Sequence, residues 1–346
     1  MTTWADAHRR AAIKAGELHG ELESPMDRPV DVFAAAASLG IVVGFAPLGG
    51  VSGLYLPRPG ATPGILLHEG HPRTRQRYTA GHELGHHVFE HAAEVDIDPE
   101  LALRRGGMDR WPDHEKEAEA FGAWFLMPRR LINHARRELG IDEPRSEFDV
   151  YALSLWLGTS YTATARQLAA TRIITPEQSD DWARIPPAEI KRALAGDMAP
   201  DDLRNDVWWL DERQQPQVVD GRPGDRLVIT LREIPASGIS WRIADQPHEL
   251  HLLADSYEDD YEPDLPTFVP EADESLTGGP APRTLVFELG APGGNAGVGR
   301  LSLVKDAPWE PSASSAEYRL LVGLHPPMHG ALVSESELAA HRPSAS

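Results

Sequence analysis

The fold of this chain is decided by the stretch Thr79-Ala80-Gly81-His82-Glu83-Leu84-Gly85-His86-His87, in a helix predicted from Arg73 to about His91. Each residue of an α-helix advances the chain by about 100°, so His82 and His86 lie about 40° apart and one turn along. Both imidazoles can therefore reach a single metal ion. His87 lies about 140° from His82 and is not expected to share that ion.

Glu83 follows the first histidine and completes the HExxH arrangement of zinc peptidases. Zinc lowers the pKa of a bound water towards about 7, and a neighbouring carboxylate accepts the proton as the hydroxide attacks a carbonyl group. Glu83 is therefore the predicted catalytic base, with His82 and His86 as metal ligands. The alternative is two ordinary surface histidines, but Gly81 and Gly85 favour a helix packed closely against another element.

A helix predicted over residues 113–127 supplies candidates for the third ligand. Its inward stripe consists of Ala118, Gly122, Phe125 and Leu126. Glu115 and Glu119 fall on the same stripe, whereas Glu117 is expected to point away from it. Because a core-facing carboxylate is costly unless it is paired or binds a metal, Glu115 is the predicted third ligand and Glu119 the second choice. The alternative for Glu115 is a residue near the helix start that the helix dipole stabilises.

The absence of cysteine limits the chemistry of the chain. Disulfides, cysteine nucleophiles and thiolate metal sites are excluded, so a metal site must use His, Asp or Glu. Zn²⁺ is the expected metal, and Mn²⁺ is the alternative because it also binds histidine and carboxylate ligands.

Two segments of the sequence together resemble the ImmA/IrrE family of metallopeptidases: residues 75–87, RQRYTAGHELGHH, and residues 115–128, EKEAEAFGAWFLMP. The family pattern for the second segment is E-x-E-A-N-x-F-A-A-x-L-L-M-P, and the resemblance covers roughly residues 10–175. The first Glu of that pattern ligates zinc in the family and falls on Glu115 here. The family's Asn is Glu119 in this chain, which implies either an added ligand or an added group behind the ligands.

The resemblance implies a mostly helical, zincin-like peptidase domain with a small β-sheet and a helix-turn-helix-like tail, which fits two helices expected over 148–171. It also implies a zinc endopeptidase that hydrolyses a peptide bond in a specific protein partner, often a helix-turn-helix repressor. Roles in transcription regulation and the stress response belong to that expectation. The alternative is a non-catalytic sensor or binding protein on a peptidase fold, but the intact His-Glu-His set favours the enzyme.

From about Gly221 the pattern of the sequence changes to alternating apolar and polar residues. The alternating runs are Arg226–Leu231, Thr284–Leu289, Arg300–Val304 and Glu317–Val322. Gly, Pro and Ser separate them, which is typical of a small all-β sandwich.

The segment Gly224–Trp241 is similar to the start of chagasin-type inhibitors of papain-like cysteine peptidases, which carry three loops on an immunoglobulin-like sandwich. The overlap spans about residues 207–325. The matching loops are Ile234–Ile239, Gly278–Pro280 and Ala307–Trp309, with Pro235, Gly238, Gly279 and Trp309 as the predicted partner-binding residues. Because Ile234, Ile239 and Ala307 replace the family's Asn, Tyr and Arg, the resemblance favours a partner-binding or regulatory module over cysteine-peptidase inhibition. The alternative for Trp309 and Trp241 is a place in the core of the sandwich.

The predicted architecture is therefore α+β and multi-domain. The expected parts are a peptidase domain over residues 1–145, a helix-turn-helix-like segment over 146–175, a connector over 176–206, a chagasin-like sandwich over 207–326 and a flexible tail over 327–346.

The formal net charge of −20 makes direct nucleic-acid binding unlikely on electrostatic grounds. The helix-turn-helix-like segment is accordingly expected to pack on the peptidase domain and not to bind DNA. The N-terminus lacks the apolar core of a signal peptide, and no window approaches the ~18 apolar residues of a membrane span. A cytoplasmic location without a membrane partner is expected.

Overall fold

The computed structural model describes residues 2–57, 60–91, 111–211, 217–233, 240–257, 281–291, 297–306, 317–324 and 330–332. The chain has the mixed α+β content that the sequence predicts. It divides into two compact units: Met1–Arg137, Leu153–Asp180 and Pro327–Arg342 form the first, and Glu138–Ala152, Asp181–Pro326 and Pro343–Ser346 form the second. These units divide the chain at different residues from the predicted domain boundaries, which stay predictions.

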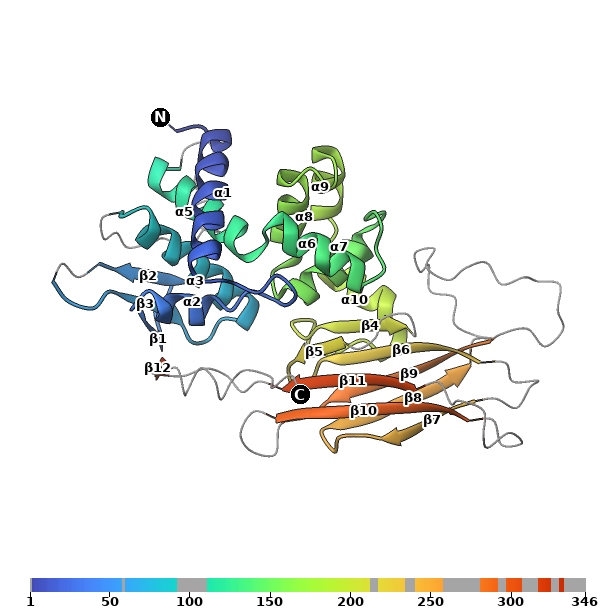
Figure 1. Cartoon of the computed structure of the whole chain (residues 1–346). Helices are drawn as coiled ribbons and strands as arrows, with labels where there is room; N and C mark the ends of the chain where they lie inside the picture. Colours follow the sequence, from blue (N-terminus) through green and yellow to red (C-terminus); the bar gives the residue numbers. More distant parts are fainter. Residues whose placement is uncertain are drawn as a thin grey trace. The chain divides into compact units, whose positions relative to one another are not determined.

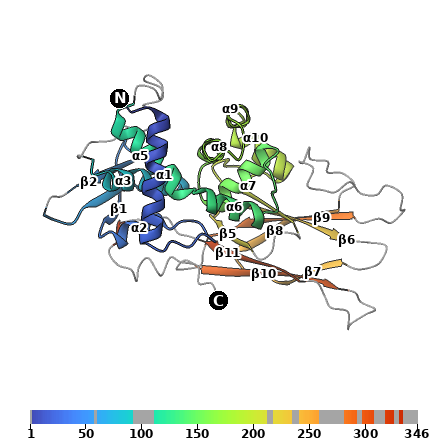
Figure 2. The ribbon, with the colours of Figure 1, turned by 45° about the horizontal axis from the view of Figure 1, so that its top comes forward.

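The helices are α1 (Trp4–Glu21), α2 (Val32–Ser38), α3 (Arg73–Val88), α5 (Asp113–Leu126), α6 (Arg129–Glu138), α7 (Glu147–Leu157), α8 (Tyr161–Ala170), α9 (Pro176–Ala183), α10 (Pro187–Ala195) and the short 3₁₀ helix η2 (Gly196–Met198). The first unit also contains the strands β1 (Val42–Ala46), β2 (Gly53–Leu56), β3 (Gly64–His68) and β12 (Gly330–Leu332). Figures 1 and 2 show these elements from two directions.

The sheet of the first unit has the strand order β12-β1-β3-β2. β1 and β3 run parallel, whereas β2 is antiparallel to β3, with Gly53 opposite Leu67. β12 comes from the far end of the chain and pairs antiparallel with β1, with Leu332 opposite Val43. Residues 327–346 were predicted to be a flexible tail, and β12 lies within them. α3 packs against β2 and β3, so the sheet supports the helix that carries the HExxH segment.

α1 packs along α5 through a stripe of small side chains. The oxygen of Thr3 caps the helix by accepting a hydrogen bond from the backbone N–H of Asp6 at 3.2 Å. The buried positions of the stripe are Ala7, Ala11, Ala15 and Leu18, at helical spacing. At the end of the helix, the ring of His19 stacks on Phe125, and its Nε2 lies 2.9 Å from the carbonyl oxygen of that residue. α1 therefore covers one side of α5.

α3 and α5 meet at backbone distance because glycines line their contact. A Cβ atom at Gly85 would lie 2.9 Å from Cα of Ala118, which is closer than real Cβ atoms approach. A Cβ at Gly122 would lie 3.0 Å from the backbone nitrogen of His82. Gly81 also faces Gly122 across the contact. This close approach brings the histidines of α3 opposite the first turn of α5.

The second unit contains the strands β4 (Val207–Asp211), β5 (Gln217–Gly221), β6 (Arg226–Glu233), β7 (Ser240–Asp245), β8 (Leu250–Tyr257), β9 (Ala281–Leu289), β10 (Gly297–Asp306) and β11 (Glu317–Leu324). They form two four-stranded sheets, with the orders β5-β11-β10-β7 and β4-β6-β9-β8. The four alternating runs of the sequence lie within β6, β9, β10 and β11. Their buried side chains include Leu227, Ile229, Phe287, Leu301, Leu303, Tyr318 and Leu320. The immunoglobulin-like assignment of this unit stays a prediction.

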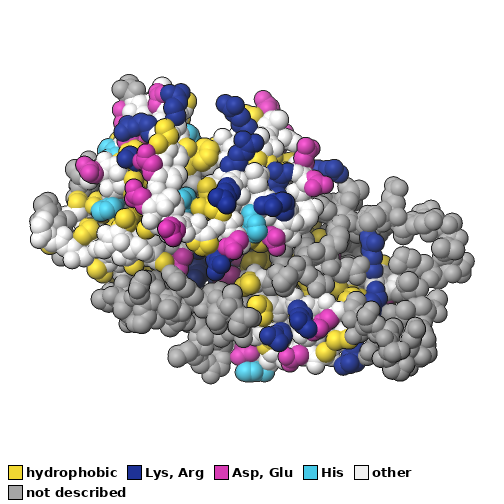
Figure 3. Space-filling view, viewed as in Figure 1, with side chains coloured by type: hydrophobic (Ala, Val, Ile, Leu, Met, Phe, Trp, Pro, Cys, Tyr) yellow, Lys and Arg dark blue, Asp and Glu magenta, His cyan; other side chains and the backbone are white. Residues whose placement is uncertain are grey.

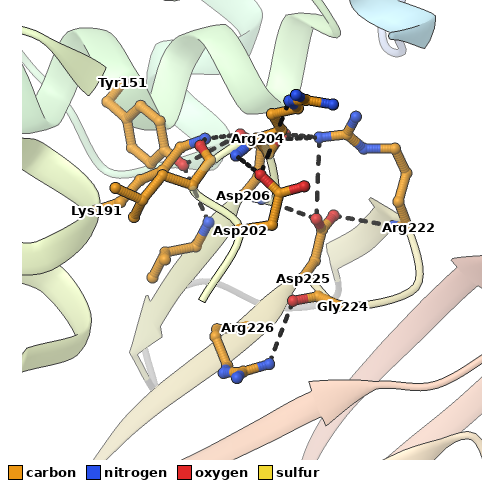
Figure 4. A network of polar contacts seen from close by, with 11 residues as sticks. Tyr151, Lys191, Asp202, Arg204, Asp206, Arg222, Gly224, Asp225 and Arg226 are labelled. Carbon is orange, nitrogen blue, oxygen red and sulfur yellow. Dashed lines mark hydrogen bonds and ion pairs between the residues drawn. The ribbon is translucent and has the colours of Figure 1, made fainter. Parts of the chain in front are cut away.

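A polar network ties helical residues of the second unit to its strands (Figure 4). Asp206, next to β4, accepts hydrogen bonds from Lys191 of α10 and from Arg222, each at 2.9 Å. Asp225 accepts from the backbone N–H groups of Asp206 and Arg222, each at 2.8 Å. Burial and the neighbouring Asp206 raise the pKa of Asp225 to about 6. The hydroxyl of Tyr151 accepts from the first N–H of β4 at 3.0 Å. Residues of the predicted connector thus form part of the β unit.

The helices α7 and α8 meet at a turn where Gly158 has a φ of 64°, in the left-handed region that glycine favours. The buried guanidinium of Arg77 donates from Nε to the carbonyl of Gly158 at 3.0 Å and from Nη2 to that of Leu157 at 3.3 Å. Gln167 of α8 donates to the carbonyl of Met127 at 3.1 Å. These bonds join the pair α7 and α8 to Arg77 of α3 and to Met127 at the C-terminal end of α5. The helix-turn-helix-like assignment stays a prediction.

Gly85→Ala should lower the free energy of unfolding of the metal-free chain by about 1–3 kcal/mol, because the added Cβ forces α3 away from α5. Gly16→Ala on the exposed side of α1 is the matched control, since a Cβ there meets nothing within 4 Å. Alanine favours a helix over glycine by about 1 kcal/mol, so the control should gain stability. Urea unfolding followed by circular dichroism measures both. Equal stabilities for the two variants would contradict the close contact.

Candidate metal centre

The structure brings together the three residues predicted to bind a metal. The Nε2 atoms of His82 and His86 lie 3.1 Å apart, on the side of α3 that faces α5. The carboxylate oxygens of Glu115, in the first turn of α5, lie 3.3 Å from His82 Nε2 and 3.6 Å from His86 Nε2. One ligand atom from each residue lies within 4.8 Å of the others. Both histidines are buried and Glu115 is partly buried, so the three form a group that can hold a metal ion.

The geometry of this group fits a zinc ion. Two nitrogen ligands of a tetrahedral zinc, each at about 2.0–2.1 Å from the metal, are separated by roughly 3.3 Å. The Nε2 separation of 3.1 Å between His82 and His86 is close to that value. Two imidazoles and one carboxylate are also a donor set that catalytic zinc sites use.

Glu119 lies behind the ring of His82, away from the point where the three ligands converge. Its Oε2 lies 3.2 Å from Nδ1 of His82, while Nε2 of the same ring faces Glu115. The hydroxyl of Tyr78 donates to Glu119 Oε1 at 2.9 Å. Burial alone would raise the pKa of Glu119, but the bonds from His82 and Tyr78 outweigh it and the pKa is lowered. Of the two roles that the sequence left open, this position favours orienting His82 over binding the metal.

Glu83, the predicted base, is 1% exposed and lies between α3 and the sheet. A Cβ atom built on Gly53 of β2 would lie 2.7 Å from Oε1 of Glu83 and 2.4 Å from Cγ2 of Thr79. Gly53 thus leaves the space that the Glu83 carboxylate fills. β2 is the outermost strand on one side of the order β12-β1-β3-β2, so the Glu83 carboxylate lies at that edge of the sheet.

A second group of polar residues, which was not predicted from the sequence, lies beside His86. Nδ1 of His91 lies 2.9 Å from Nδ1 of His86, and Nε2 of His91 lies 3.2 Å from Glu117. Glu117 is 6% exposed and also pairs with Arg10, so the expectation that it points away from the core is wrong. The prediction of one inward stripe assumed that α5 is covered on one side only. The second cover is α1, and the regular spacing of alanines in α1 was the signal for it.

The four predicted partner-binding residues, Pro235, Gly238, Gly279 and Trp309, lie outside the described residues. Trp241, at the start of β7, is described and is 4% exposed. Its indole Nε1 donates to the carbonyl of Arg232 at 3.2 Å. Trp241 is therefore a core residue of the second unit, which is the alternative stated for it in the sequence analysis.

The charge on the surface is not uniformly negative despite the acidic excess. On the face shown in Figure 3, Lys and Arg side chains gather around α6 and the neighbouring helices. Arg129, Arg130 and Arg137 of α6 are exposed. The prediction against nucleic-acid binding rested on net charge, and it stays a prediction. None of the described helices has the length and apolar character needed to cross a bilayer.

The variants Glu115→Ala and Glu119→Ala should distinguish a metal ligand from a residue that orients a ligand. Loss of Glu115 removes one of three ligands, so purified Glu115→Ala should contain little zinc. Loss of Glu119 frees the ring of His82 and should weaken zinc binding about 10- to 100-fold while leaving a site that fills at high zinc. Metal content by mass spectrometry and affinity by chelator competition measure the two effects. Full zinc content in Glu115→Ala, with none in Glu119→Ala, would exchange the two roles.

Solved structures similar to the C-terminal part include the cysteine protease inhibitor EhICP2 from Entamoeba histolytica (18% identity, TM-score 0.28, 35% of this chain and 96% of the inhibitor). Amebosin (19% identity, TM-score 0.26, 35% and 98%) and PbICP-C in its complex with falcipain-2 (15% identity, TM-score 0.19, 35% and 91%) are also similar. Similarity at this level does not extend their activity to this chain.

No curated protein significantly matches the chain in sequence. In the N-terminal region the match is to a peptidase family. Residues 36–165, which include His82, Glu83, His86 and Glu115, match the family model of the IrrE N-terminal-like domain, Peptidase_M78.

Proposed function

We propose that this protein is a zinc-dependent endopeptidase, in which His82, His86 and Glu115 hold the metal and Glu83 is the catalytic base. The observation that carries the proposal is the convergence of one ligand atom each from His82, His86 and Glu115, with the buried Glu83 next to His82 in the sequence of α3. The match of residues 36–165 to a peptidase family supports it. A role for Mn²⁺ in place of Zn²⁺ would leave the ligands and the base unchanged.

The residues of the chain divide the chemistry among themselves. A bound zinc ion supplies Lewis acidity, which activates a water molecule and polarises a carbonyl group. Glu83 takes a proton from the attacking water on its carboxylate and delivers it to the leaving amine. Glu119 holds the ring of His82, and Gly53 keeps the carboxylate of Glu83 in place. An extended substrate chain can align along β2, because that strand ends the sheet order beside Glu83.

A partner-binding role for the β unit belongs to the same proposal. Glu233 ends β6, and its carboxylate accepts from the N–H of Trp241 at 2.6 Å, the hydroxyl of Tyr257 at 2.7 Å and the guanidinium of Arg283 at 2.9 Å. These residues stand where β6, β7, β8 and β9 begin or end. Glu233 thus ties the ends of these four strands together at one end of the second unit. This supports a binding surface built on those strand ends.

The substrate is proposed to be a specific protein, with a helix-turn-helix repressor as the leading candidate. That choice, the cytoplasmic location and the roles in stress response and transcription regulation rest on the family resemblance alone. A non-catalytic sensor on the same fold remains the competing proposal, and the following experiments separate the two.

Glu83→Gln should keep stoichiometric zinc and lose cleavage by about 10²- to 10⁴-fold, because the proton acceptor is removed while the ligands stay. Zinc content is measured by mass spectrometry, and cleavage on a proteome-derived peptide library and on purified helix-turn-helix repressors. Cleavage by Glu83→Gln at the wild-type rate would remove Glu83 from the role of base. Zinc-loaded wild type that cleaves neither probe would favour the sensor.

Gly53→Ala should also keep zinc but reduce cleavage by about 100-fold, because the new methyl group displaces the Glu83 carboxylate. Gly50→Ala, in the turn before β2, is the control, since a Cβ there meets nothing within 4 Å. The same two assays apply. Wild-type cleavage by Gly53→Ala would mean that the position of Glu83 against β2 is not needed for the reaction.

A further inference from the structure

The C-terminal turn of α3 folds the chain back onto one of its own metal ligands. The backbone N–H of His91 donates to the carbonyl of His86 at 2.9 Å, and that of Glu90 donates to the carbonyl of His87 at 3.0 Å. These two bonds form a Schellman motif, with Glu90 at the left-handed position, where its φ is 57°. A glutamate rarely occupies that region, which favours glycine and asparagine. The turn places the side chain of residue 91 over that of residue 86.

A chain of hydrogen bonds runs from His86 to the N-terminal helix. The Nδ1 atoms of His86 and His91 lie 2.9 Å apart, and Nε2 of His91 lies 3.2 Å from Oε2 of Glu117. The other oxygen of Glu117 pairs with the guanidinium of Arg10 in α1. The side chains of His86, His91 and Glu117 are 5%, 11% and 8% exposed, so solvent has little access to the bonds among these three, whereas the side chain of Arg10 is 55% exposed. Arg10 also lies over the ring of Phe89, 5.3 Å from its centroid.

The bonds define which ring nitrogens carry protons. The Glu117 carboxylate only accepts, so Nε2 of His91 donates to it. Nδ1 of a neutral His91 is then an acceptor, and the facing Nδ1 of His86 must be the donor. This leaves the lone pair of His86 on Nε2, the atom that faces His82 and Glu115. The arrangement is the one that ligation through Nε2 requires.

We propose that His91, Glu117 and Arg10 are positioning residues that hold His86 in the metal-binding tautomer and orientation. The inference rests on the proposed metal site. It gives His86 a support of the same kind as the one that Glu119 gives to His82. α1 lies outside the residues 36–165 that match the peptidase family, yet through Arg10 it takes part in the site. The N-terminal helix is thus a functional element and not only a cover for α5.

The experiment compares zinc affinity and the absorption spectrum of bound Co²⁺ in three variants of the full chain. His91→Phe keeps a ring against Phe89 but offers no nitrogen to His86, and it should weaken zinc binding about 10- to 100-fold and change the Co²⁺ spectrum. His91→Asn places an amide oxygen near the former Nδ1 and should restore most of the affinity. His87→Phe, which instead loses a 2.8 Å bond to Tyr55, is the control and should bind as the wild type does.

Nitrogen-15 NMR of the histidine rings tests the proton assignment without any variant that might unfold. His86 should carry its proton on Nδ1 both before and after zinc is added. A proton on Nε2 in the metal-free chain would overturn the proposal, as would unchanged affinity and Co²⁺ spectrum in His91→Phe. Arg10→Gln, at an exposed position, removes the charged partner of Glu117 and should weaken zinc binding several-fold.

These outcomes are distinct from a failure of the proposed function. A zinc-loaded chain that cleaves nothing, but whose affinity falls in His91→Phe, would keep the positioning role and remove the peptidase. A wild type that binds no zinc would remove the metal site, and the spectrum of the metal-free chain would still show whether the hydrogen-bond chain exists.

Discussion

The contact of α3 with α5 at backbone distance is the constraint on which the candidate site depends. A metal ion bonds each of its ligands at about 2 Å, so the donor atoms of α3 and α5 must meet at one point, and the close approach of these two helices sets where their side chains meet. Gly85 and Gly122 allow that approach, and each would clash with backbone if it gained a side chain. The glycines of the HExxH segment are therefore as much a part of the site as its histidines. Helix propensity opposes them, which shows that tertiary contact decides these positions.

Around that contact, the two candidate histidine ligands are each held from behind by a different part of the fold. Glu119 and Tyr78 hold His82, and the turn after α3 together with α1 holds His86. Glu83 is confined by the backbone of β2 at Gly53. Two helices thus supply the candidate ligands, the turn after α3 and the helix α1 support His86, and β2 confines Glu83. Orientation of this kind keeps donor atoms converged, which is what rapid metal binding and reaction need.

The sequence predicted those parts of the site that depend on local geometry. The spacing of His82 and His86 follows from the helical repeat, and Glu115 follows from the stripe that α5 presents to α3. Glu119 lies on the same predicted stripe. Its role as a support for His82 depends on where Nδ1 of that ring lies, and a sequence pattern does not predict this. Glu117 was misplaced because α5 is covered on two sides. His91 was missed because it lies past the helix end, where a non-glycine residue occupies a left-handed turn.

The pairing of β12 with β1 joins the two ends of the chain in one sheet. Contacts between residues so distant in sequence form late, because a long loop must close first. During synthesis, β1 emerges early and its outer edge lacks this partner until the β unit and the residues beyond it have been made. The sheet of the first unit therefore gains β12 only after the strands β4 to β11 of the second unit have been made. Closure of this sheet is in this way linked to synthesis of the second unit.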